Sequence, residues 1–76
     1  MNKNILKAFG NQIKIERNRL GLSQEDFASL AGMHRTYIGI VERGEKNITL
    51  KNIQKIANAL NIKISKLFME LENIDV

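Results

Sequence analysis

Apolar residues recur at intervals of three and four along most of the chain, which is the spacing of amphipathic helices. Over residues 3–20 the stripe consists of Ile5, Leu6, Phe9, Ile13 and Leu20. Gly21 follows this stripe as a C-cap. Gly10 lies inside the helix, where glycine costs about 1 kcal/mol relative to alanine. We therefore expect Gly10 to mark close packing against a neighbouring element.

Two short helices joined by a tight turn are predicted next. Ser23 is an N-cap residue for the second helix, whose first turn carries acidic residues that complement the helix dipole. Gly32 can take the positive φ that a sharp turn after this helix requires. The third helix is predicted over residues 35–43 and ends at Gly44. His34 precedes it, where Ser, Thr or Asp is more usual, so this helix is weakly capped.

Two more helices complete the predicted fold. Thr49 caps a fourth helix, which ends at Asn61 and carries the stripe Leu50, Ile53, Ile56, Ala57 and Leu60. Ser65 is expected to cap a fifth helix with Leu67, Phe68 and Leu71 on its apolar face. No repeat or linker interrupts the pattern. We therefore predict an all-α, compact five-helix domain over residues 1–76.

The stretch from Ser23 to Gly44 has the residue types of a helix-turn-helix at about residues 24–43. Ala28 is small where two steeply crossed helices must approach, and an apolar wedge lies between them: Phe27, Ala31, Met33, Ile38 and Val41. The stretch resembles the helix-turn-helix of the phage repressor/Cro (XRE-type) superfamily, whose second helix lies in the DNA major groove. Within that superfamily, the run HRTYIGIVERGEKNITL is most similar to controller proteins of restriction–modification systems.

This resemblance covers nearly the whole chain and implies a function. Repressor-like domains are five-helix bundles, and the small controller proteins are homodimeric regulators of transcription. The partners implied are double-stranded DNA, a second copy of the chain and RNA polymerase. Two alternatives stay open: another phage or bacterial repressor, and the DNA-binding antitoxin of a toxin–antitoxin pair.

The third helix supplies the candidate base contacts. If Ile38 and Val41 pack inward, the outward positions are His34, Arg35, Thr36, Gly39, Ile40 and Arg43. Arg35 can reach a guanine edge with two hydrogen bonds, and Thr36 offers a hydroxyl and a methyl group. Gly39 has no side chain, so its backbone could approach the groove floor. Arg35 and Thr36 are the predicted base contacts; the alternative is that both are ordinary solvated residues.

A second set of residues is predicted to contact phosphates or sense DNA shape: Gln24, Tyr37, Arg43, Lys46 and Asn47. Gln24 matches the family's backbone-clamping glutamine, at a helix start where N–H groups also point outward. The others flank the recognition helix. Such contacts supply affinity and salt dependence, but they do not choose the sequence.

The resemblance also implies an ion pair between Arg17 and Glu42. An unpaired Glu42 on a helix that faces phosphates would oppose binding. A dimer interface is predicted from the apolar surface of the last two helices, namely Ile62, Ile64, Leu67, Phe68, Met69 and Leu71. A two-fold dimer would set two recognition helices about 34 Å apart. The alternative is that these residues only complete the monomer core.

Charge supports a polyanionic partner. The net charge is +4, yet residues 1–69 carry 12 Lys and Arg against 5 Asp and Glu, whereas Glu70, Glu72 and Asp75 lie in the last seven residues. An anionic membrane surface would also fit this charge, but no long Lys-rich amphipathic helix is present.

Composition argues against catalysis and metal binding. The chain has no Cys and a single His, so neither a disulfide nor a structural zinc site is expected, and no cofactor is predicted. Ser23 and Ser65 sit at predicted helix caps, and the chain lacks a nucleophile–base pair, a phosphate loop and paired catalytic carboxylates, so no enzyme activity is expected. Without a signal peptide or an 18-residue apolar run, the expected compartment is the cytoplasm.

Overall fold

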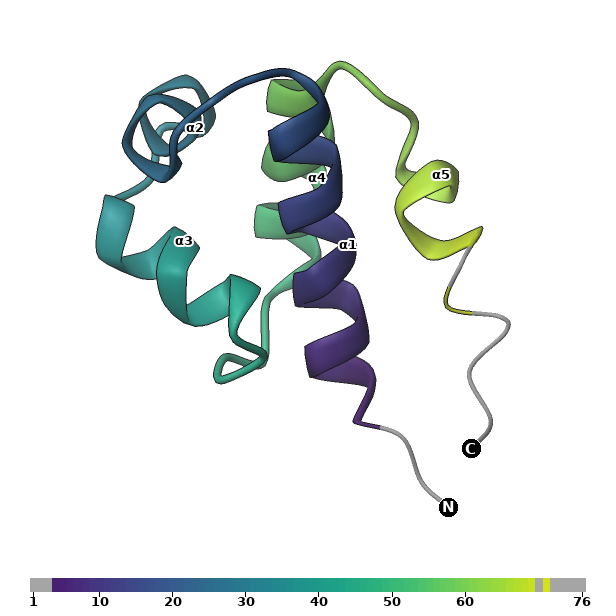
Figure 1. The fold of residues 1–76 in the computed structure, drawn as a ribbon. Helices are drawn as coiled ribbons and strands as arrows, with labels where there is room; N and C mark the ends of the chain where they lie inside the picture. Colours follow the sequence, from purple (N-terminus) through teal and green to yellow (C-terminus); the bar gives the residue numbers. More distant parts are fainter. Residues whose placement is uncertain (1–3, 70, 72–76) are drawn as a thin grey trace.

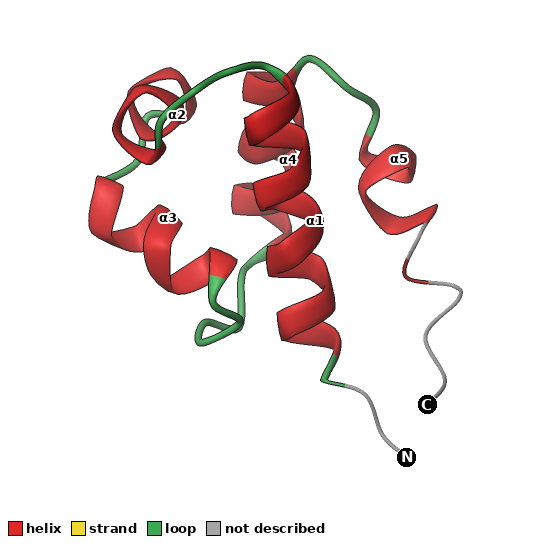
Figure 2. Cartoon of the chain, in the orientation of Figure 1, coloured by secondary structure: helices red, strands yellow, loops and turns green. Residues whose placement is uncertain are grey.

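The computed structural model of this 76-residue chain describes residues 4–69 and residue 71, and its regular structure there is entirely helical (Figure 2). The helices are α1 (Ile5–Arg19), α2 (Gln24–Ala31), α3 (Arg35–Glu42), α4 (Leu50–Leu60) and α5 (Ile64–Met69). The predicted all-α, five-helix architecture is confirmed. In Figure 1, α2 and α3 form one side of the molecule and α5 the other. Helix α1 contacts α3 and α5, whereas α4 contacts α2 and α5.

Side-chain caps fix where the helices begin. The Ser23 hydroxyl accepts a hydrogen bond from the Asp26 N–H at 3.0 Å, and the Thr49 hydroxyl accepts one from the Asn52 N–H at 3.2 Å. Both predicted N-caps are therefore confirmed. His34 also acts as a cap, because its Nδ1 accepts from the Thr36 N–H at 3.3 Å. At 3.3 Å this bond is slightly longer than those of Ser23 and Thr49.

The prediction that Ser65 caps the last helix is wrong. Helix α5 already begins at Ile64, so Ser65 lies inside its first turn. The physical reason is that the Lys63 carbonyl accepts a hydrogen bond from the Lys66 N–H at 3.0 Å, which starts the helical turn earlier. The predicted C-caps Gly32 and Asn61 are confirmed, and both adopt left-handed conformations, with φ of 68° and 58°. The predicted C-cap Gly21 lies one residue after the observed C-cap of α1, Leu20.

One hydrophobic core joins all five helices. It consists of Phe9, Ile13, Phe27, Ala28, Ile38, Val41, Ile53, Ile56, Ala57, Leu60 and Leu67. Three residues of the predicted stripes are instead exposed: Ile5, Leu20 and Leu50, the last of them 73% exposed. Each lies at the end of its helix, where fewer neighbouring residues cover it. Helical spacing identified the correct face, but it could not show where the covered part of that face ends.

Gly10 lies where α1 packs closely against α3. A Cβ atom at this position would lie 2.2 Å from the Val41 carbonyl oxygen and 2.7 Å from that of Glu42. Both distances are far inside van der Waals contact, so any larger residue would force the two helices apart. The close packing predicted from the sequence is confirmed, and it brings the first helix against the end of the third.

Candidate nucleic-acid interface

A buried polar network positions α3. Arg17 Nε donates to Glu42 Oε2 at 2.7 Å, and Arg17 Nη2 donates to Glu42 Oε1 at 3.0 Å. The third arm of the guanidinium, Nη1, donates to the Leu22 carbonyl at 2.7 Å. The two side chains are 9% and 3% exposed. The ion pair that the family resemblance implied is thus present in the structure, and it holds α1, the α1–α2 connection and α3 in one arrangement.

Gln24, at the start of α2, joins this network. Its Nε2 donates to Glu42 Oε1 at 2.9 Å, so the amide orientation follows from the carboxylate that it faces. One Nε2 hydrogen forms this bond, and the second is free for another acceptor. Helix α2 therefore presents Gln24 beside α3 with a donor available.

Arg35 and Thr36 lie in the first turn of α3, and both are exposed. Ile38 and Val41 are buried in the core, as the predicted register of the helix requires. The exposed face therefore begins at the N-terminal end of α3, next to the His34 cap. Helix-turn-helix proteins insert this end of the recognition helix into the major groove.

The backbone at Gly39 is not open to solvent, contrary to the expectation that it could approach the groove floor. It is buried, because neighbouring side chains fold over it. A Cβ atom there would lie 3.3 Å from Arg43 Nη1 and 3.8 Å from Gln24 Oε1. Around it lies a hollow of about 190 Å³, lined by Gln24, Arg35, Thr36, Gly39 and Arg43. The structure thus brings four of the predicted DNA-contacting side chains together around one glycine.

Tyr37 is half-buried and is held by a partner that the sequence analysis missed. Its hydroxyl oxygen accepts a hydrogen bond from Asn52 Nδ2 at 3.0 Å. The hydroxyl hydrogen is therefore left to donate, for example to a phosphate oxygen. Asn52 lies in the first turn of α4. The one available signal was its position three residues after the Thr49 cap, which does not reveal a contact with Tyr37.

The other predicted phosphate contacts lie at or just after the C-terminal end of α3, on what we call the rim of the recognition face. Arg43 is the C-cap residue of α3, and Lys46 and Asn47 lie in the loop before α4; all three are exposed. Arg43 Nη2 lies 3.1 Å from Glu45 Oε1, and these side chains are 59% and 54% exposed. Glu45 is not among the residues that the sequence pattern predicts to contact DNA.

The predicted dimer surface needs one correction. Leu67 belongs to the core and is inaccessible to solvent, so its assignment to a dimer interface is wrong. The reason is that α5 turns this residue inward, against α1 and α4. Phe68 stacks on Phe9 with ring centroids 5.4 Å apart. The others are Ile62, Ile64 and Leu71, which are partly buried against the core, and Met69, which is 62% exposed.

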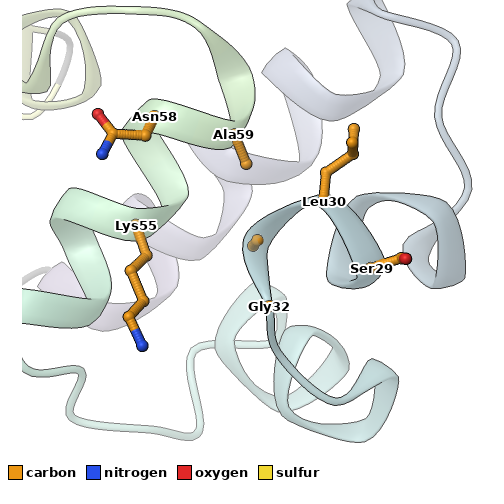
Figure 3. A pocket seen from close by; sticks show the side chains of 7 residues that line it. Ser29, Leu30, Gly32, Lys55, Asn58 and Ala59 are labelled. Atoms are coloured by element: carbon orange, nitrogen blue, oxygen red, sulfur yellow. The ribbon is translucent and has the colours of Figure 1, made fainter.

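A second hollow, of about 440 Å³, lies between α2 and α4 (Figure 3). Leu30, Lys55 and Asn58 line it, but their side chains point in different directions in the figure. A catalytic or ligand site requires polar groups that converge on one point. Within residues 4–69 and 71, three or more potential metal ligands do not gather anywhere, and no helix is long and apolar enough to cross a lipid bilayer.

Comparison with known proteins gives matches over most of the chain. Residues 13–67 match the helix-turn-helix family. The control protein C.MunI of Mycoplasma sp is 40% identical over 65 residues, which are 84% of this chain and 88% of the relative. The crystal structure of the restriction–modification controller protein C.AhdI from Aeromonas hydrophila is similar, with 48% identity, a TM-score of 0.81, and coverage of 83% and 96%. The controller protein C.Esp1396I, solved as a tetramer in complex with its natural 35-base-pair operator, shares 31% identity, with a TM-score of 0.84 and coverage of 93% of each chain.

Proposed function

We propose that this chain, which belongs to the helix-turn-helix family and within it to the restriction–modification controller proteins, binds a two-fold operator as a homodimer. It is a DNA-binding regulator of transcription. Binding to a two-fold operator, formation of the homodimer and the role of each contacting residue are proposed here.

The observation that carries the proposal is the exposed N-terminal face of α3. Arg35 and Thr36 lie on it, and the buried pair of Arg17 and Glu42 holds the other end of the same helix against α1. A planar guanidinium at this position matches the O6 and N7 acceptors of guanine in the major groove, and Thr36 can meet a thymine methyl group. Arg35 and Thr36 are accordingly the proposed base contacts.

Phosphate contacts are proposed for the residues around this face. Gln24 has one amide hydrogen free, and the Tyr37 hydroxyl hydrogen is available to donate while its oxygen accepts from Asn52. Both are therefore matched to an acceptor such as a phosphate oxygen. Lys46, Asn47 and Arg43 add donors and positive charge along the rim.

A dimer is supported by the apolar side chains in and next to α5 that the core covers only in part or not at all. Met69 is the most exposed of them, and Ile62, Ile64, Phe68 and Leu71 are each partly accessible. Burial of this surface in a second copy would place two α3 helices about one turn of DNA apart, or about 34 Å. The tetramer seen for C.Esp1396I on its operator is consistent with several copies on one site.

Regulation of transcription brings in RNA polymerase as a proposed partner and the cytoplasm as the proposed location. The controller role would also place the gene beside those of a methyltransferase and an endonuclease. The antitoxin alternative makes a different prediction, because the protein would then co-purify with an equimolar partner.

Selection from a randomised duplex library tests the proposal. Purified protein is mixed with the library, bound duplexes are sequenced, and the recovered site is footprinted. We expect a two-fold motif bound with an affinity on the order of 10⁻⁸–10⁻¹¹ M. Binding without preference for any sequence over random duplex would contradict the proposed function.

A further inference from the structure

The Arg43 guanidinium lies nearer the N-terminal end of α3 than the Arg43 backbone does. Arg43 is the C-cap residue of α3, at the end of the helix that would lie away from the floor of the DNA major groove. Its Nη1 nevertheless lies over Gly39, 3.3 Å from where a Cβ atom would be. Because helical side chains tilt toward the N-terminus, a residue covers the turn that precedes its own Cα. The guanidinium is thereby carried about 6 Å back along the helix, onto the face that holds Arg35.

Gly39 makes this arrangement possible. Residues 35, 39 and 43 are four apart and so share one face of the helix. A longer side chain at position 39 would fill the space that the Arg43 guanidinium occupies. With glycine there, Arg35 and Arg43 border the same hollow, together with Thr36 and Gln24.

Glu45 occupies one arm of the Arg43 guanidinium. It pairs with Nη2 at 3.1 Å, so the arm that faces the rim already has a carboxylate partner. A phosphate at that edge would meet the negative charge of Glu45, which disfavours it. The Nη1 arm, over Gly39, faces the hollow instead. An arginine fixed on one arm also loses less conformational freedom when the rest of its fork binds an acceptor.

We propose that Arg43 is a second base-reading residue, which reaches a guanine-type acceptor edge through the gap at Gly39, and that Glu45 is the residue that positions it. The inference rests on the proposed DNA-binding function and goes beyond it. Arg43 then determines specificity at a base pair distinct from the one that Arg35 reads, in place of serving only as a phosphate contact.

Arg43→Lys is the decisive variant, because it keeps the positive charge that a phosphate needs but loses the planar fork that a guanine edge needs. Parent and variant are each selected against the same randomised duplex library. At one position per half-site, we expect the ratio of affinities for the preferred base and for the other bases to fall by about 5- to 150-fold in the variant. Its affinity for a non-operator duplex and the dependence of that affinity on salt should match the parent.

Glu45→Gln tests the positioning role. Loss of one negative charge should strengthen binding to non-operator duplex, yet the preference at the Arg43 position should fall. A residue with only a structural role would not change the preference at one base pair alone. Lys46→Ala is the control, and it should weaken binding to all sequences alike.

Arg43→Lys that retains every base preference would overturn the assignment of Arg43. Unchanged preference at that position in Glu45→Gln would overturn the role of Glu45. If the parent protein itself shows no sequence preference, the proposed function fails instead, so the two failures are distinguishable.

Discussion

Arg17 and Glu42 lie 25 residues apart in the chain and form a buried ion pair with two parallel hydrogen bonds. Glu42 is the last residue of α3, the helix that carries the proposed base contacts. Together with Gln24 Nε2, the guanidinium surrounds the carboxylate with three N–H donors. The negative charge of Glu42 is thereby compensated inside the protein, and α3 can face phosphates without an opposing acid.

Glu42→Ala should destabilise the protein by about 3–5 kcal/mol, because it leaves the Arg17 guanidinium buried without its partner. The measurement is the free energy of unfolding by denaturant or heat. Lys14→Ala is a control, since Lys14 is an exposed cation on the same helix as Arg17. It should stay within about 0.5 kcal/mol of the parent. A Glu42→Ala protein that also stays within that range would show that the pair contributes little.

Gly10→Ala should destabilise the protein even though alanine is the better helix former. The added Cβ would lie 2.2 Å from the Val41 carbonyl oxygen, and that backbone cannot move without shifting α3. A loss of about 1–3 kcal/mol is expected, which outweighs a propensity gain of about 1 kcal/mol. Asn11→Ala is the matched control, because Asn11 is the next residue and is exposed. That variant should be neutral or slightly stabilised; equal behaviour of the two would mean that α1 and α3 are not tightly packed.

Arg35→Ala should separate specificity from affinity. The variant should bind the selected operator with about 1–3 kcal/mol less binding free energy, and it should lose the base preference at one position per half-site. Lys46→Ala should weaken binding to every sequence and make the salt dependence shallower, as expected for a phosphate contact. Both are measured on the operator and on its single-base mutants at two salt concentrations. If the two variants behave alike, the proposed orientation of α3 in the groove is wrong.

Met69→Glu should shift the protein from dimer to monomer without unfolding it. Met69 is 62% exposed on α5, so a charge there is tolerated in the monomer but not in a buried interface. Leu30→Glu is the control, because Leu30 is also 62% exposed but lies on α2, across the molecule from α5 (Figure 1). Sedimentation at micromolar concentration should show a monomer for Met69→Glu and a dimer for Leu30→Glu. A parent protein that is monomeric both free and on DNA would refute the dimer.

Local signals were sufficient for the architecture. Helical spacing located five helices, and Ser23, Thr49, Gly32 and Asn61 marked helix ends that the structure confirms within about one residue. These signals work because a cap or a positive φ depends only on residues within one turn. The excess of Lys and Arg and the helix-turn-helix pattern likewise indicated DNA before any contact was known.

The tertiary structure decided what each helical face meets. Leu67 and Met69 lie two residues apart on an apolar helix, yet the core covers the first and leaves the second exposed. Gly39 faces outward by periodicity, but Gln24 and Arg43 fold over it. The contact from Asn52 to Tyr37 joins different helices, so no local pattern announces it. Periodicity specifies the direction of a side chain from its own helix, whereas its neighbours depend on how the helices cross and on which rotamers fill the space between them.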